Sequence, residues 1–208
     1  LGRILDGAAG DLWFISIYVG ICIRLMPEWG WKIWFLCAVS GFLCHAPQSR
    51  LADYYRQIHL FFLNGKEGSE LDDASKQVEL YKQMSWSKQP VQKLFQFFYK
   101  NYTKGQENDT PQFQWFKRTL REKYPQQLPD ALRADFRKGS LPLMKYANIL
   151  TFNWRSITLF VAILLGEPAL YPIVEIIVFT CIFMYMRWCH EGLCKRLNQA
   201  VLDGKYDA

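Results

Sequence analysis

Four runs of apolar residues divide the chain into two pairs that flank a polar middle. The runs cover residues 12–23, 33–44, 157–165 and 170–188. Tryptophans such as Trp29 and Trp154 flank them, and Trp is frequent where a membrane helix meets the headgroups. A helix needs about 17–25 residues to cross a bilayer, and the flanking residues bring each run near that length. The pattern predicts four transmembrane helices.

Short joins between the runs predict how these helices are paired. Residues 26–32 join the first two runs and residues 166–172 join the last two, so each pair forms an antiparallel hairpin. Both joins then lie on one side of the membrane, and the polar middle and the C-terminal tail lie on the other. The latter side carries nearly all of the Lys and Arg residues, which places it in the cytoplasm. We therefore expect an integral protein of an inner or cytoplasmic membrane.

The predicted fold class is all-α, a polytopic membrane helical bundle with a helical cytoplasmic insert. Residues 1–49 form the first hairpin, residues 50–140 the insert, and residues 141–208 the second hairpin and tail. Within the insert, apolar residues recur at helical spacing after Pro90 and again after Pro111, and both prolines suit a first helical turn. The apolar residues after Pro90 are Val91, Leu94, Phe95, Phe98 and Tyr102.

Charge indicates a lipid surface rather than a nucleic acid as the partner of the insert. Residues 50–140 contain 16 Lys and Arg against 11 Asp and Glu, and the basic residues are scattered among the acids. Such a mildly basic face is attracted to anionic headgroups, whereas nucleic-acid binding favours clustered basic residues. The mean hydropathy of −0.09 averages this polar insert with the apolar runs.

Two aspartates just before the first apolar run are the clearest indication of a functional site in the sequence. Asp6 and Asp11 precede an almost wholly apolar stretch, and acids in such a helix usually serve an ion, a proton path or a substrate. They could instead only cap the water-facing end of the helix. Cys189, His190 and Cys194 are close in sequence, but we interpret the six cysteines as small apolar residues.

Polar and basic residues at the other helix ends are expected to converge on the same side of the membrane. Arg50 follows the second run, and Lys145, Asn148 and Arg155 precede or enter the third. Carboxylates facing such groups suit a divalent cation and a phosphate-bearing substrate, because hard cations take oxygen ligands and Arg pairs with phosphate. The alternative is that the basic side chains extend to lipid headgroups.

The stretch from Gly2 to Asp6 resembles the second half of the CDP-alcohol phosphatidyltransferase signature. That signature reads Asp-x2-Asp-Gly-x2-Ala-Arg-x8-Gly-x3-Asp-x3-Asp, and Gly2 and Asp6 match its last glycine and third aspartate. We expect the first half of the signature to precede Leu1. The fourth aspartate is due at Gly10, whereas Asp11 lies one residue later, about 140° around a regular helix from Asp6.

The resemblance implies transfer of a phosphatidyl or related phosphoryl group from a CDP-linked donor to an alcohol acceptor, with release of CMP. It implies a divalent metal, Mg²⁺ or Mn²⁺, bound by Asp6 and Asp11, with Asp11 as the base and with Gly2 and Arg3 among the substrate-binding residues. A homodimer is compatible with it. Two alternatives stay open at this point: a membrane prenyltransferase, and a scaffold or transporter subunit in which the acids pair with Arg155 or Arg50.

Overall fold

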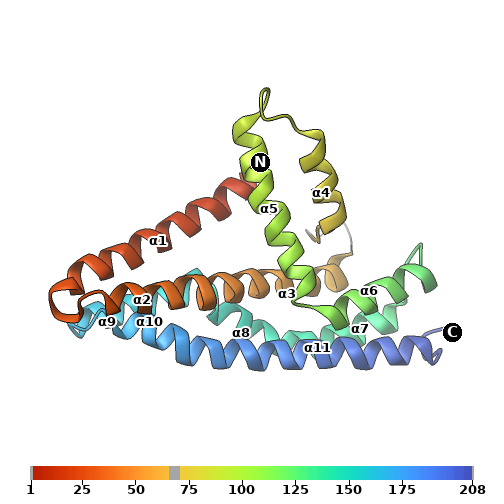
Figure 1. Cartoon of the computed structure of the whole chain (residues 1–208). Coiled ribbons are helices and arrows are strands. Elements are labelled where there is room, and N and C mark those ends of the chain that lie inside the picture. The colour runs from red at the N-terminus through yellow and green to blue at the C-terminus, as the bar shows by residue number, and fades with distance from the viewer. Residues whose placement is uncertain (1, 66–70, 208) are drawn as a thin grey trace.

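The computed structural model describes residues 2–65 and 71–207, with side chains at residues 9, 10, 12–65 and 71–207. The described residues form helices joined by short turns, and no β-strand occurs among them (Figure 1). The all-α prediction is confirmed for this part of the chain. Gly2, Arg3, Asp6 and Asp11 have a helical backbone, but their side chains lie outside the described set.

The N-terminal part of the chain is a hairpin of two long helices. Helix α1 runs from Gly2 to Trp29, and Gly30 then turns the chain at a φ of 57°. The return helix is continuous and consists of α2 (Lys32–Ala38), the π-helical segment η1 (Val39–His45) and α3 (Ala46–Asn64). It ends at Gly65, whose φ of 79° suits glycine and whose N–H donates a hydrogen bond to the carbonyl of Phe61.

The C-terminal part forms a second hairpin. Helix α9 (Phe152–Leu164) is followed by a turn at Gly166, which has a φ of 74°. The returning helix then comprises α10 (Leu170–Val174), the π-helical segment η4 (Glu175–Phe179) and α11 (Thr180–Leu202). Figure 1 shows the turns of both hairpins at the same end of the molecule, with the C-terminus at the opposite end. The predicted pairing into two hairpins is therefore present.

The polar middle of the chain is helical, as the periodicity predicts. Its elements are α4 (Ala74–Gln83), α5 (Pro90–Asn108), α6 (Pro111–Lys123), α7 (Asp130–Ser140), the short 3₁₀ helix η3 (Leu141–Leu143) and α8 (Met144–Ile149). Pro90 and Pro111 each occupy the first position of a helix, where the missing proline N–H costs no hydrogen bond.

Three helical segments, rather than the predicted four, are long and apolar enough to cross a membrane in the part of the chain that is described. They are Leu12–Trp29, Asp130–Leu164 and Leu170–Leu202. The apolar run of the helix from Lys32 to Asn64 is shorter, because Lys32 precedes it and polar residues such as His45 and Arg50 follow it within the same helix. This helix packs beside the other hairpin elements through η1, which contacts η4 and α10.

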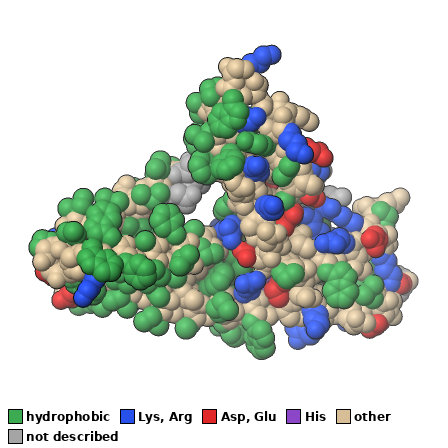
Figure 2. All heavy atoms as spheres, in the orientation of Figure 1, with side chains coloured by type: hydrophobic (Ala, Val, Ile, Leu, Met, Phe, Trp, Pro, Cys, Tyr) green, Lys and Arg blue, Asp and Glu red, His purple; other side chains and the backbone are tan. Residues whose placement is uncertain are grey.

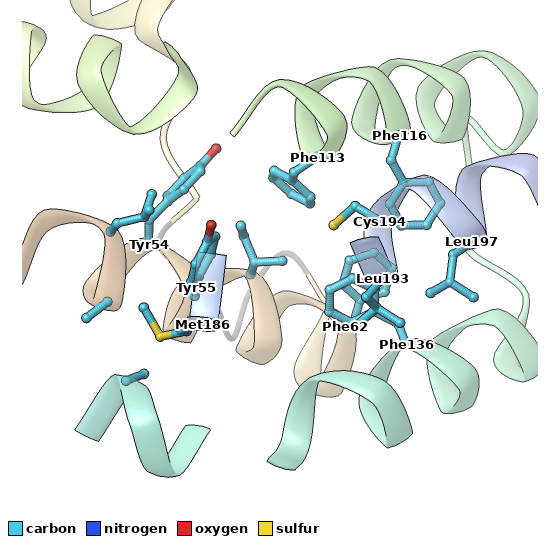
Figure 3. Packing of buried hydrophobic residues seen from close by; sticks show 14 of the residues in the cluster. Tyr54, Tyr55, Phe62, Phe113, Phe116, Phe136, Met186, Leu193, Cys194 and Leu197 are labelled. Carbon is cyan, nitrogen blue, oxygen red and sulfur yellow. The ribbon is translucent and has the colours of Figure 1, made fainter. Parts of the chain in front are cut away.

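Buried apolar side chains form two clusters, one toward each end of the molecule. The cluster nearer the hairpin turns joins α1 and α2 to the second hairpin through residues such as Tyr18, Ile33 and Tyr171. The larger cluster joins α3, α6, α7 and α11, and its aromatic centre includes Phe62, which stacks on Phe136 at 3.8 Å between ring centroids (Figure 3).

The insert is therefore not separate from the hairpins. The boundary predicted at residue 50 falls inside a continuous helix, and α6 packs along α11. Gly139 of α7 allows a close approach to α11, because a Cβ at this position would lie 2.5 Å from Leu193 Cδ1.

Helices α4 and α5 project from the side of the bundle as an arm, which we define as residues 74–108 (Figure 1). Asp73 attaches the start of the arm to α6, since Arg121 Nη2 lies 2.9 Å and Lys117 Nζ 4.0 Å from its carboxylate. Burial alone would raise the pKa of Asp73, but hydrogen bonds from Arg121 and Ser75 and the charge of Lys117 outweigh it and lower the pKa to about 2.

We expect Asp73→Asn to loosen α4 at neutral pH and to have little effect near pH 2. A lowered folded-state pKa contributes stability above the unfolded-state pKa of about 3.9, and this contribution is lost as the pH falls through the folded-state pKa. Amide hydrogen exchange in α4, compared with the parent at each pH, measures the difference. Asp130→Asn serves as a control because Asp130 is exposed. A difference that does not change between neutral and acidic pH would contradict this role of Asp73.

Candidate functional site

A group of polar side chains is enclosed between the two hairpins, near the apolar cluster at their turns. We call it the Glu175 cluster. Its members are Tyr18, Ser40, His45, Gln48, Arg155, Tyr171 and Glu175, and each is buried. They come from α1, η1, α3, α9, α10 and η4, so that the cluster connects both hairpins.

The carboxylate of Glu175 is the centre of this cluster. One carboxylate oxygen accepts hydrogen bonds from the hydroxyls of Tyr18 and Ser40. The other accepts a bond from Arg155 Nη1 and lies 3.0 Å from His45 Nδ1. The hydroxyl of Tyr171 is 3.4 Å from the same oxygen. With a charged partner and several donors, Glu175 is satisfied as an ionised side chain although it is fully buried.

Each nitrogen of the Arg155 guanidinium donates a hydrogen bond within the protein. Besides the bond to Glu175, Arg155 Nη2 donates to Gln48 Oε1 at 2.9 Å and Nε donates to the carbonyl of Leu150 at 3.0 Å. The guanidinium also lies 5.2 Å from the ring centre of Phe179. Only 1 % of Arg155 is exposed, so its guanidinium is not accessible to the phosphate-bearing substrate expected from the sequence. The structure gives Arg155 an internal ion pair instead.

Both π-helical segments supply residues to the cluster. Ser40 and His45 lie on η1, and Glu175 is the first residue of η4. A π segment turns side chains out of the register of a regular α-helix and is frequent at functional sites. Here the two segments contact each other, and the change of register aims Ser40, His45 and Glu175 at one point.

A cavity of about 320 Å³ lies beside the Glu175 cluster, between α1 and the helix that follows the first turn. Its walls are mostly apolar and include Phe14, Cys22 and Phe42. Tyr18 and His45 belong both to this wall and to the cluster. The cavity can accommodate an apolar group, and only the edge of the polar cluster faces it.

The other predicted substrate-binding residues have separate surroundings. Arg50 pairs with Asp109 at 2.5 Å, where α3 meets the end of α5. Lys145 is exposed on α8 with its ammonium 4.9 Å from the ring centre of Tyr146, and Asn148 is exposed on the same helix. The described residues thus do not unite Arg50, Lys145, Asn148 and Arg155 in one open phosphate site. Gly2, Arg3, Asp6 and Asp11 lie outside the described side chains.

Sequence reasoning missed the centre of the cluster. Glu175 lies within the fourth apolar run, and His45 follows the second, yet neither was selected as a candidate. A single acid inside a long apolar run was the signal that could have found it, because ionisable residues there usually have a partner or a function. Arg155, just before the third run, is its partner in the structure.

His190, Glu191 and Cys194 form the one group of three potential metal ligands found among the described side chains. His190 Nδ1 lies 3.6 Å from Cys194 Sγ and 3.9 Å from Glu191 Oε1. Nitrogen and sulfur donors suit Zn²⁺ better than Mg²⁺, which prefers oxygen ligands. Glu191 also accepts the backbone N–H of Gln112 at 2.7 Å, which satisfies the start of α6. This donor set therefore does not match the magnesium or manganese site predicted at Asp6.

Comparisons with known proteins do not assign the chain to a family. No family model matches the chain, and neither a curated protein nor a solved structure shows significant similarity to it.

Proposed function

We propose that the chain belongs to a membrane-embedded phosphotransferase, which moves a phosphatidyl or related phosphoryl group from a CDP-linked donor to an alcohol and releases CMP. The observation that carries this proposal is Asp6, near the start of a helix whose following residues are mostly apolar and in part outward-facing. Leu12 is 64 % and Ile23 67 % exposed on the protein surface, as expected of residues that contact lipid. Carboxylates at the entrance of such a helix usually bind an ion, transfer protons or contact a substrate.

The arginines that could balance this charge have other partners. In the alternative of a scaffold or transporter subunit, Asp6 and Asp11 pair with Arg155 or Arg50. Arg155 is instead bonded to Glu175, and Arg50 to Asp109. We therefore favour a divalent cation as the partner of Asp6. This agrees with the resemblance, in which Asp6 matches a metal-binding aspartate of the CDP-alcohol phosphatidyltransferase signature.

The backbone of α1 limits how the two aspartates can act together. It is a regular α-helix from Gly2 to Trp29, in which residues 6 and 11 are about 140° apart. We therefore assign the metal to Asp6, and Asp11 could contribute as a base only from a different face of α1. A bound Mg²⁺ or Mn²⁺ would supply positive charge to the diphosphate of the donor.

The proposed orientation predicts opposite sides for two exposed residues. We expect Lys104→Cys, on α5, to be labelled only from the cytoplasmic side, and Glu167→Cys, in the second hairpin turn, only from the other side. Membrane-impermeant maleimide applied to intact cells and to inverted vesicles measures this, after the native cysteines have been replaced. Labelling of both positions from the same side would contradict the hairpin topology.

The products formed from two different donors distinguish the proposed phosphotransferase from a prenyltransferase. Purified full-length protein in nanodiscs is given CDP-diacylglycerol or a prenyl diphosphate, with a panel of small alcohols and Mn²⁺. The proposal predicts CMP from the first donor and no diphosphate from the second. Diphosphate release from the prenyl donor alone would favour the prenyltransferase and overturn the proposal.

A further inference from the structure

The arm formed by α4 and α5 has an unusual distribution of polar and apolar side chains. The buried residues of α5 are polar, namely Gln96, Thr103 and Gln106. Gln96 Nε2 donates to Gln77 Oε1 of α4 at 2.8 Å, and Gln106 Nε2 donates to the carbonyl of Arg50 at 3.2 Å. The two helices of the arm and its base are therefore joined through polar contacts, together with a ring contact between Tyr81 and Phe97. Several apolar side chains of α5 stay exposed.

Those apolar side chains share one face of α5. Val91 is 60 %, Leu94 45 % and Phe98 60 % exposed, and their spacing of three and four residues places them along one stripe. We call these three residues the arm face. In Figure 2 apolar side chains gather on the flank of the arm that faces the hairpin turns, whereas charged side chains gather on the opposite flank. An apolar flank of the arm therefore faces the hairpin turns.

The attachment of the arm to α3 sets the position of the arm along the length of the helix bundle. Arg50 pairs with Asp109 at the end of α5. Gly105 lies so close to Arg50 that a Cβ there would be 2.5 Å from Nη1. About 20 residues of helix separate Arg50 from the turn at Gly30, which corresponds to about 30 Å at 1.5 Å per residue. This equals the hydrocarbon thickness of a typical bilayer. With the hairpin turns at one surface of the bilayer, the base of the arm would lie at the other, where lipid tails meet headgroups.

The charged side chains of α5 are mostly basic, which favours an anionic membrane surface. Helical spacing places Lys93, Lys100 and Lys104 on the side away from the arm face. Lys93 and Lys100 also lie over the ring of Tyr81 in α4, and Glu107 is the one acid of the helix. A helix with an apolar face and a lysine-rich polar face is typical of segments that lie in the membrane interface. Trp86, exposed in the turn between α4 and α5, is a residue type that favours the same layer.

We propose that the arm face docks on the bilayer surface, with Val91, Leu94 and Phe98 inserted at the boundary between headgroups and acyl chains of an anionic leaflet. The arm then lies along the membrane plane beside the spanning helices and fixes the level of the bundle in the bilayer. This inference requires that the apolar helices span a membrane, but it is independent of the proposed reaction.

Photocrosslinking from defined positions tests this docking. Phe98→p-benzoylphenylalanine and Val91→p-benzoylphenylalanine place a photoreactive group on the arm face, and Lys104→p-benzoylphenylalanine places it about 120° from Phe98 around the same helix. The full-length variants are reconstituted in nanodiscs of three parts phosphatidylcholine to one part phosphatidylglycerol, illuminated and analysed by mass spectrometry. We expect lipid adducts at positions 91 and 98 at least about tenfold above those at position 104.

The same experiment identifies any other occupant. Equal lipid adducts at positions 98 and 104 would overturn the docking, as would crosslinks from position 98 mainly to a second copy of the chain or to a co-purified protein. The three positions are exposed, so the labels are compatible with the fold, and size-exclusion elution identical to the parent confirms this for each variant. Lipid adducts at position 98 that persist while those at position 91 are absent would also contradict a helix lying flat on the surface.

Discussion

Replacing Glu175 with alanine should destabilise the protein by about 3–5 kcal/mol, the range found when one partner of a buried ion pair is removed. Glu175→Ala leaves the charged Arg155 without its carboxylate in an enclosed site, and it also removes the acceptor of the hydroxyls of Tyr18 and Ser40. Each of these groups loses a partner that water cannot replace there. Chemical or thermal unfolding of the purified protein in nanodiscs measures the change.

Two further variants separate the ion pair from a general effect of substitution. Glu167→Ala removes an exposed acid from the second hairpin turn and should change stability little. The double variant Arg155→Met with Glu175→Met removes both charges and should lose less stability than Glu175→Ala, because no unpaired charge stays buried. A single variant as stable as the Glu167→Ala control would contradict the role assigned to the Glu175 cluster.

Replacing Asp6 with asparagine should lower phosphotransferase activity by at least about 100-fold, comparable with the removal of a group that stabilises charge in a transition state. Asparagine keeps the size of the side chain but removes the negative charge that would hold Mg²⁺ or Mn²⁺. The protein should keep its elution profile and its unfolding transition. The measurement is the rate of CMP formation at saturating Mn²⁺, in the parent and the variant.

Asp203→Asn is the matched control for this prediction. Asp203 lies at the end of α11, where it is exposed and accepts a hydrogen bond from Gln199 at 2.9 Å. The same chemical change at this position should leave the rate of CMP formation unaltered. Equal rates in the parent and in Asp6→Asn would show that Asp6 is not part of the metal site, even if the reaction itself is confirmed.

Local signals in the sequence were sufficient to predict much of the fold. Pro90 and Pro111 begin helices, and short glycine-containing joins form the two hairpin turns. These signals act through the backbone of a few neighbouring residues, so they can be recognised without knowledge of the tertiary structure.

The interior of the bundle could not be predicted in the same way. The partner of Arg155 is Glu175 rather than a phosphate, and this depends on how two hairpins pack and on two π-helical segments that carry no simple sequence pattern. The apolar spacing after Pro90 correctly predicted a helix, but it did not show that Leu94 and Phe98 face outward while Gln96 faces inward. Burial is set by tertiary contacts, which spacing alone does not specify.

Transfer of the labelled phosphatidyl group to an alcohol tests the proposed function most directly. Full-length protein in nanodiscs is incubated with Mn²⁺ and CDP-diacylglycerol that carries a labelled acyl chain, and lipid products and CMP are quantified together. We expect one CMP for each labelled phospholipid formed, with both products lost when Mn²⁺ is chelated and restored when it is added back. CMP formation that needs no divalent metal, or the absence of CMP with every alcohol supplied, would contradict it.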